Sequence, residues 1–192
     1  KRWLDKEENL LTKMRNNHSQ WIRTLGACWG YAGFFLLMLF AIVRLAAVSI
    51  DAMLYEIKAW HWLLLIANTL FMAYSEGYKG FQKNYSPRLA ARALYLSKHG
   101  STKQLLLAPA FCMSFFNAPR KRIIISYSIL VMVIVLVTLF RFLPQPIRGI
   151  LDFGVVVGLS WGVISVAYFA YCYAFGSLIA VDGEVTEEVA SN

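Results

Sequence analysis

The chain has 192 residues, of which 58% are hydrophobic and only 16% are charged, and its mean hydropathy is +0.52. Soluble domains carry about 25% charged residues, so this composition excludes an ordinary soluble domain and predicts an integral membrane protein. The net charge of +8 does not indicate nucleic acid, because the cations lie beside long apolar runs, where anionic lipid headgroups are the nearer partner. We expect a single membrane domain over residues 1–192.

Two apolar runs precede the most basic part of the chain. Residues 24–43 form an uncharged run of 20 residues, which matches the roughly 20 residues that a helix needs to cross a bilayer. A signal peptide has a shorter apolar region of about 7 to 15 residues, so we expect a retained helix. Residues 59–76 are predicted to form the second transmembrane helix. Ahead of both, residues 1–23 are predicted to form an amphipathic lead on the cytoplasmic side.

Two further apolar runs follow. Residues 123–140 are rich in Ile, Val and Leu and almost free of polar groups, which predicts a third transmembrane helix that faces lipid. Residues 153–181 carry no charge over 29 residues, about 44 Å of helix, so the fourth transmembrane helix must tilt or project beyond the hydrocarbon. The remaining residues, 182–192, are predicted to form a flexible acidic tail.

The segment between the second and third crossings, residues 77–122, holds nine of the nineteen basic residues and no acidic residue. We predict that it forms a basic platform at the membrane interface. Its first helix is expected to begin at Ser86 and Pro87, as N-cap and first helical residue, and to end at Gly100.

A second helix of this platform is predicted from a capping box formed by Ser101 and Gln104. The apolar run that follows, residues 105–116, is too short to cross a bilayer and is interrupted by Pro109. We therefore expect it to lie at the inner boundary or to dip into it as a re-entrant segment.

The distribution of Lys and Arg predicts the orientation. Fifteen lie in the N-terminal and central segments, and four lie in the two short connections between paired helices. Because cytoplasmic loops carry the excess of Lys and Arg, both termini are expected in the cytoplasm, and the membrane is expected to be a plasma membrane of the bacterial inner-membrane type. The fold class is thus all-α, with four transmembrane helices and a cytoplasmic interfacial segment.

Two sets of small residues predict where helices pack. Gly26 and Gly30, with Gly33, share a face of the first crossing, and Gly154, Gly158 and Gly162 recur every four residues in the fourth. Glycine at such spacing lets another backbone approach closely. Since the two sets lie at opposite ends of the bilayer, each is expected to need its own neighbour, and one neighbour is expected to be another chain.

Glu76 is the sharpest candidate for a functional site. An ionised carboxylate near lipid is costly, so it needs a partner, and Lys79 or Arg120 is expected to supply one. A salt-bridged anchor is one interpretation, and a proton or cation site is the other. Near the opposite boundary, Asp152 is expected to pair with Arg148 or Arg141, and Asp51 with Arg44.

No residue pattern predicts a catalytic or metal site. The three histidines, His18, His61 and His99, do not share a spacing suited to haem or metal, and the three cysteines form no CxxC pair. Paired carboxylates, serine nucleophiles and phosphate loops are not found either, so we expect no enzyme activity and no cofactor.

The sequence favours a non-enzymatic accessory or assembly subunit of a larger membrane complex, which also binds anionic lipid headgroups. Other membrane subunits, or a second copy, are the expected protein partners. The alternative is a small oligomeric transporter or channel that uses Glu76. The residues predicted to bind lipid or a partner are basic and lie in the central segment: Lys79, Arg88, Arg92, Arg120, Lys121 and Arg122.

Overall fold

The structure, a computed structural model, describes the backbone of residues 2–175 and the side chains of residues 20–175. Every element in this range is helical, and no strand occurs in it. The predicted acidic tail and the end of the predicted fourth crossing lie outside the described residues. The helices are α1 Arg2–Ala52, α2 Ala59–Met72, the π-helix η1 Ala73–Tyr85, α3 Ser86–His99, α4 Thr102–Leu106, α5 Ala108–Cys112, α6 Arg120–Phe140 and α7 Ile147–Ala174.

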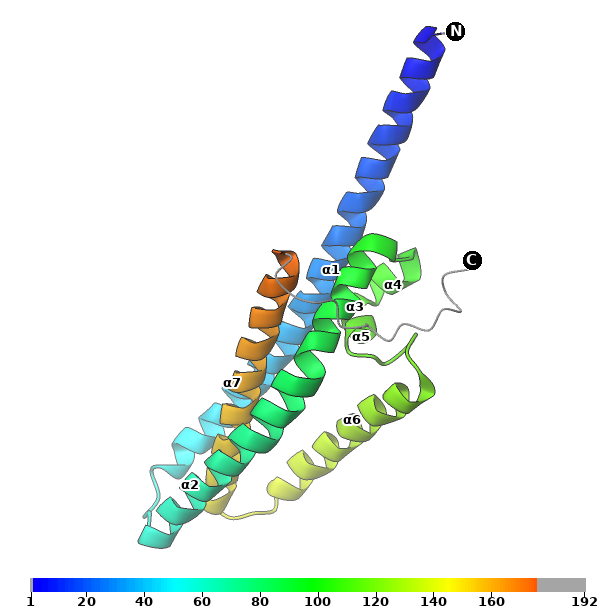
Figure 1. The fold of residues 1–192 in the computed structure, drawn as a ribbon. Helices are drawn as coiled ribbons and strands as arrows, with labels where there is room; N and C mark the ends of the chain where they lie inside the picture. Colours follow the sequence, from blue (N-terminus) through cyan, green and yellow to red (C-terminus); the bar gives the residue numbers. More distant parts are fainter. Residues whose placement is uncertain (1, 176–192) are drawn as a thin grey trace.

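The first helix is longer than the crossing predicted within it. α1 runs for 51 residues, and Figure 1 shows that its N-terminal part continues in line with the rest and extends well beyond the other helices. The predicted lead over residues 1–23 is therefore, from Arg2, the start of this same helix. A short turn, residues 53–58, leads from α1 into α2.

The predicted start of a helix at Ser86 is wrong, because α2, η1 and α3 follow one another without a break (Figure 1). Tyr85 and Ser86 both have right-handed helical dihedrals, and the Ser86 N–H donates to the carbonyl of Phe81, five residues earlier. The wider π-helical turn gives room for the ring of Pro87, which would otherwise clash with a carbonyl four residues back. The predicted end is right, since α3 ends at His99 and Gly100 follows as C-cap.

The predicted capping box at Ser101 and Gln104 is present at the start of α4. The apolar run over residues 105–116 is not one helix along the membrane, however. Leu107 departs from helical geometry, and Pro109 stands in the first turn of the separate helix α5. α5 folds back onto α1 and α3, which buries Phe111 and Cys112.

One hydrophobic core lies at the end of the bundle where α1, α3, α5 and α7 meet. Its fully buried members include Phe34, Leu96, Phe111 and Val166, one from each of these helices. Figure 1 shows that this end is opposite the turn between α1 and α2. The central segment therefore contributes α3 and α5 to the bundle and to its hydrophobic core.

α6 stands apart from the other helices over most of its length (Figure 1), and none of its residues is buried. Within the part of the chain that the structure describes, three helices are long and apolar enough to cross a membrane: Gln20–Ala52, Arg120–Phe140 and Ile147–Ala174. The predicted second crossing is not among them, because α2 has only 14 residues before the π-helix begins.

Candidate functional site

Glu76 lies in the first turn of η1, on the side that packs against α7. Its side chain is partly buried, and it faces Gly158 so closely that a Cβ built on this glycine would lie 3.1 Å from Glu76 Oε2. A long π-helix is rare, and π-helical turns are frequent at functional sites. The sequence thus places a carboxylate where one helix contacts the backbone of another.

The salt bridge expected for Glu76 is not formed. Lys79 and Arg120 are both exposed, and among residues 20–175 no cation lies within 4.0 Å of the Glu76 carboxylate. No described side chain or backbone group donates a hydrogen bond to it either. The interpretation of Glu76 as a salt-bridged anchor therefore loses its structural basis.

α2 and η1 together form one continuous helical rod over residues 59–85. The rest of its contact with α7 is formed by the predicted glycines and by the side chains opposite them. Gly154 contacts Asn68, and a Cβ on Gly162 would lie 2.7 Å from the Phe81 ring. Two hydrogen bonds between α7 and the rod add to this contact. Asn68 Nδ2 donates to the carbonyl of Ile150 at 3.0 Å, and Trp161 Nε1 donates to Gln82 Oε1 at 2.9 Å.

The glycines of α1 also have their neighbours within the chain. Gly26 contacts Leu105, a Cβ on Gly30 would lie 2.7 Å from Cys112 Sγ, and one on Gly33 would lie 2.5 Å from Pro109. The expectation that one glycine face is filled by another chain is therefore wrong, because α4 and α5 fold back onto α1 and fill it.

Arg92, predicted to contact lipid or a partner, is 1% exposed. Its Nε donates to the carbonyl of Phe111 at 2.8 Å, and its two terminal nitrogens donate to the carbonyls of Phe116 and Asn117 at 2.9 to 3.2 Å. A guanidinium surrounded in this way is not offered to a headgroup. Arg92 is a structural residue, which corrects the prediction.

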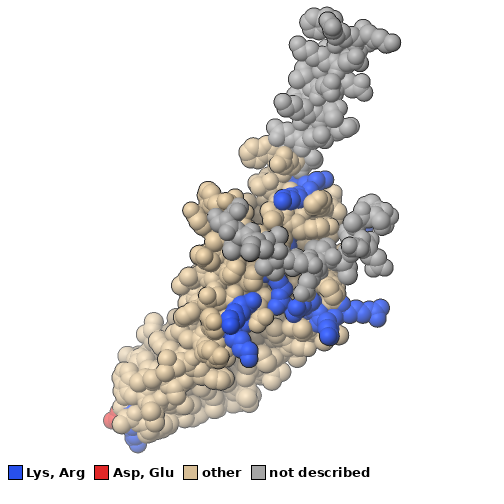
Figure 2. All heavy atoms as spheres, viewed as in Figure 1, with Lys and Arg blue, Asp and Glu red and all other residues tan. Residues whose placement is uncertain are grey.

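The other predicted cations remain near the surface. Lys79, Arg120 and Lys121 are exposed, whereas Arg88 and Arg122 are partly buried, and Arg88 Nη2 donates to Asn84 Oδ1 at 3.2 Å. Figure 2 shows Lys and Arg side chains gathered across the middle of the visible face, with uncharged surface from there toward the lower tip.

An open recess of about 590 Å³ lies at the start of α6. Its lining combines two cations, Lys121 and Arg122, with three apolar residues, Pro119, Ile124 and Ile125. Recesses that bind small ligands have volumes of roughly 300 to 1,000 Å³. A ligand with both a negative and an apolar part matches this lining.

The opposite end of the bundle also carries polar groups. Arg148 Nε lies 3.8 Å from Asp152 Oδ2, so this expected pair is present. His61 is buried, and its Nδ1 accepts a hydrogen bond from the Lys58 N–H. Among the residues that the structure describes, no group of three His, Cys, Asp or Glu side chains could hold a metal ion.

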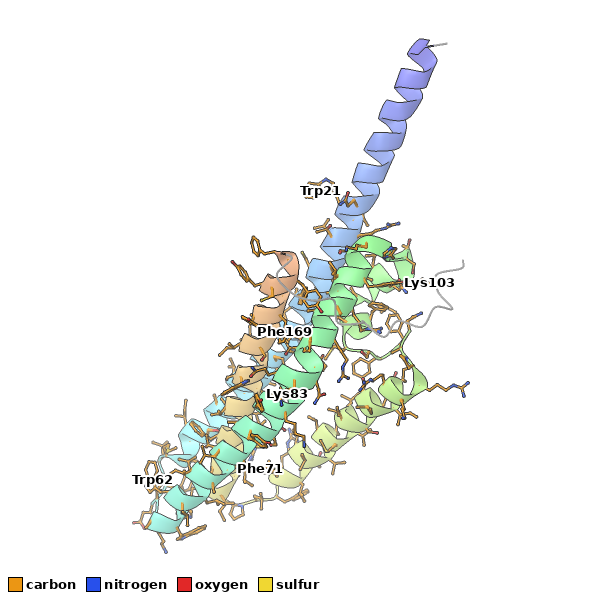
Figure 3. The ribbon with its side chains drawn as sticks, viewed as in Figure 1. Trp21, Trp62, Phe71, Lys83, Lys103 and Phe169 are labelled. Atoms are coloured by element: carbon orange, nitrogen blue, oxygen red, sulfur yellow. The ribbon has the colours of Figure 1, made fainter. Side chains whose placement is uncertain are left out.

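Sequence reasoning missed an apolar surface on α1. Trp21 and Leu25 are each 65% exposed and Trp29 is half exposed, and Figure 3 shows Trp21 directed away from the bundle. These residues lie five to thirteen positions before Phe34, whose ring packs against Tyr85, so they extend about 8 to 20 Å beyond that level along the helix. Their spacing of four residues is the signal that could have identified them.

No protein-family model, curated protein or solved structure is similar to this chain. The class of protein therefore rests on the fold itself. Over residues 2–175 the regular structure is all helical, and three of these helices are long and apolar enough to span a membrane.

Proposed function

We propose that the chain crosses the membrane four times and that its hydrocarbon-facing part lies between two charged levels. One level is the turn after Ala52, and the other is the level of Phe34, Lys83 and Arg120. From Phe34 to Ala52 is 18 residues, about 27 Å of helix, which is close to the roughly 30 Å of a hydrocarbon core. α6 has 21 residues, about 31 Å, between the same levels.

The second crossing in this proposal is the α2–η1 rod from Ala59 to Glu76. α2 alone is too short, but the rod continues without a break, and Lys79 and Lys83 are exposed just beyond Glu76. Moving the hydrocarbon toward the hydrophobic core would bury Lys83 and the cations at the start of α6 in lipid, at about 2.5 to 3.5 kcal/mol each near mid-membrane. The proposed boundary leaves one exposed cation of α1, Arg44, between the two levels, at a comparable cost. Because the alternative would place several cations in lipid, the charges on balance favour a boundary at the level of Phe34 and Lys83. The first crossing then covers residues 34–52 instead of the predicted 24–43.

The excess of basic residues at this boundary supports a cytoplasmic position for the hydrophobic core, by the positive-inside rule. α1 begins and α7 ends on that side of the bundle (Figure 1). Both termini then lie in the cytoplasm, and the membrane is a plasma membrane.

The proposed role is that of a non-enzymatic accessory or assembly subunit of a larger membrane complex. The observation that carries this proposal is the exposed apolar surface of α1 beyond the boundary, which we name the α1 surface and which consists of Trp21, Ile22, Leu25 and Trp29. Lipid tails do not reach this far, and a cluster of large apolar residues exposed to water marks a protein interaction site. The α1 surface thus replaces the glycine faces as the predicted docking surface.

The same protein is proposed to hold anionic lipid headgroups. Lys79, Lys83, Arg120 and Lys121 are exposed at the proposed boundary, where each contributes about 1 kcal/mol of attraction to an anionic leaflet. This attraction fixes the height of the bundle in the membrane and so presents the α1 surface to the cytoplasm at a constant level.

The docking role is tested by native mass spectrometry after gentle extraction from the natural membrane. Wild-type protein should appear in a complex of reproducible stoichiometry with other polypeptides, and the variant Trp21→Ala/Leu25→Ala should lose it. The matched control is Leu36→Ala/Phe40→Ala, which removes residues that are equally exposed but lie on the hydrocarbon side. A lone monomer or homo-oligomer in wild type would reject the accessory role.

A second candidate function is a small oligomeric transporter or channel. It is favoured by the partly buried carboxylate of Glu76, which has no ion-pair partner among residues 20–175 and faces Gly158. In reconstituted vesicles, Glu76→Gln should abolish flux of the transported ion without altering the thermal unfolding midpoint. Glu56→Gln, an exposed carboxylate on the connection between α1 and α2, is the control. Normal flux through Glu76→Gln would remove Glu76 from the mechanism.

A further inference from the structure

The sides of α6 need an apolar environment that the described residues of the chain do not provide. α6 is tied to the bundle near its start, where Ser126 Oγ donates to the Met113 carbonyl at 3.2 Å and the rings of Phe115 and Tyr127 meet at 5.3 Å between centroids. Beyond this point it stands apart, and none of its residues is buried. A helix that is apolar on all sides is stable only among lipid tails or other apolar groups.

The composition of α6 favours lipid over a partner helix. Residues 129–137 are all Ile, Leu, Val or Met, whereas helices that pack against each other in membranes use Gly, Ala, Ser and Thr at the contact. The glycine-lined faces of α1 and α7 show this difference within the same chain, because each is filled by another helix. Flexible acyl chains can cover the bulky, uneven surface of α6.

The start of α6 adds charge to this apolar surface. In the recess described above, Lys121 and Arg122 lie beside Ile124 and Ile125, and Arg120 is exposed next to them. Positive charge at the boundary and isoleucine one turn further into the hydrocarbon match an amphiphile that carries a phosphate above its acyl chains.

We propose that the recess at the start of α6 is a specific site for an anionic phospholipid, whose phosphate is held by Lys121 and Arg122. The acyl chains lie along Ile124 and Ile125 and continue down α6. Inorganic phosphate would contact only the cations of the recess, and a protein helix would meet no small residues against which it could pack closely. A phospholipid would contact both the cations and the apolar residues. This assignment rests on the membrane boundary proposed above.

The affinity test is a native mass spectrometry titration of the purified full chain with phosphatidylglycerol and with phosphatidylcholine. Wild type should prefer phosphatidylglycerol, and Lys121→Gln/Arg122→Gln should lower that preference by about fivefold for each cation removed. The matched control is Lys58→Gln/Arg141→Gln, which removes two exposed cations from the other end of the bundle and should leave the preference unchanged. An unchanged preference in the first variant, or an equal loss in both, overturns the proposal.

A second measurement needs no variant and so does not depend on how a variant folds. Phosphatidylglycerol with a photoreactive group near the head end of one acyl chain should label wild-type protein within residues 119–125. Labelling spread over α1 and α7 overturns the proposal, as does displacement of the lipid by an equal concentration of inorganic phosphate. Capture of the partner complex is measured separately with the α1 surface variant, so a failed lipid site with an intact complex would reject this inference alone.

Discussion

The guanidinium of Arg92 lies 4.2 Å from the centroid of the Phe111 ring, and its Nε donates to the carbonyl oxygen of the same residue at 2.8 Å. Arg92 of α3 thus contacts both the side chain and the backbone of Phe111 in the last turn of α5. The loop that follows contains Ser114 and Asn117 with φ of 63° and 51°, a left-handed conformation that costs energy in residues other than glycine. Hydrogen bonds from Arg92 to Phe116 and Asn117 stabilise this loop.

Replacing Arg92 should therefore destabilise the hydrophobic core. Arg92→Leu removes the Arg92 hydrogen bonds to the partly buried carbonyls of Phe116 and Asn117, at about 1 to 3 kcal/mol for each group that water cannot reach. The carbonyl of Phe111 also loses Arg92 but still accepts from the Ser114 N–H at 3.0 Å. We expect a total loss of about 2 to 5 kcal/mol, seen as a lower thermal unfolding midpoint in detergent. Arg92→Lys should recover only part of it, because an ammonium cannot reach all three acceptors at once.

The control for Arg92 is Lys103→Leu, an exposed cation on α4 that should leave the unfolding midpoint within about 0.5 kcal/mol of wild type. If Arg92→Leu were as stable as this control, the buried hydrogen bonds would not hold α5 in place. The assignment of Arg92 to structure, and not to lipid contact, would then be wrong.

The three cysteines report where the boundary lies. Cys28 is exposed and lies six residues, about 9 Å, beyond Phe34 on the side proposed to be cytoplasmic, so a water-soluble maleimide should label it in inverted membrane vesicles. Cys112 is buried, and its burial raises the pKa of the thiol to about 12 despite the nearby Arg92. The reactive thiolate is therefore scarce at pH 8, and Cys112 should stay unlabelled.

Intact mass measurement should then show one adduct per chain, and Cys28→Ser should show none, since Cys172 is buried as well. Labelling that occurs only after detergent is added would place Cys28 within the hydrocarbon. In that case the boundary would lie further toward Trp21, and the α1 surface would be covered by lipid.

Local patterns in the sequence predicted local structure well. The capping box at Ser101 and the C-cap at Gly100 depend on neighbouring residues only, and both are present. The Arg148–Asp152 pair is one helical turn apart and is also present. The helix start at Ser86 failed because the same Ser-Pro signal is compatible with a helix that widens into a π-helix before the proline.

The burial of Arg92, and the fact that Glu76 has no ion partner among residues 20–175, could not be predicted from the sequence. Both depend on contacts between distant segments: α5 and the loop after it cover Arg92 from 19 to 25 residues away, and Glu76 faces Gly158 of α7, whereas Lys79 and Arg120 are exposed. The sequence of a basic segment does not distinguish cations that become buried from cations that stay exposed, because burial depends on the tertiary contacts.

The contact between Gly162 and Phe81 should not tolerate a methyl group. A Cβ on Gly162 would lie 2.7 to 2.8 Å from three ring carbons of Phe81, and that ring is held in turn by Phe34 and Tyr85. We expect Gly162→Ala to destabilise the protein by about 1 to 3 kcal/mol, measured from its thermal unfolding midpoint. Ala167→Val, which adds carbon atoms at an exposed position of α7, is the control. Equal midpoints for the two variants would show that α7 can move away from the rod at little cost.

Neighbouring residues Asn68 and Thr69 allow the polar contact of α2 with α7 to be tested by a matched pair of substitutions. Asn68 Nδ2 donates to the carbonyls of Ile150 and Leu151 at 3.0 and 3.3 Å, so Asn68→Leu should cost about 0.6 to 1.7 kcal/mol, the range for such bonds between membrane helices. Thr69 Oγ1 is buried without a hydrogen-bond partner among the described residues, so Thr69→Val removes an unsatisfied group and should be neutral or stabilising. The thermal unfolding midpoints of both variants test this prediction. An equal loss of stability in both would indicate that this part of α2 is sensitive to any substitution, and that the Asn68 hydrogen bonds do not specifically hold α7.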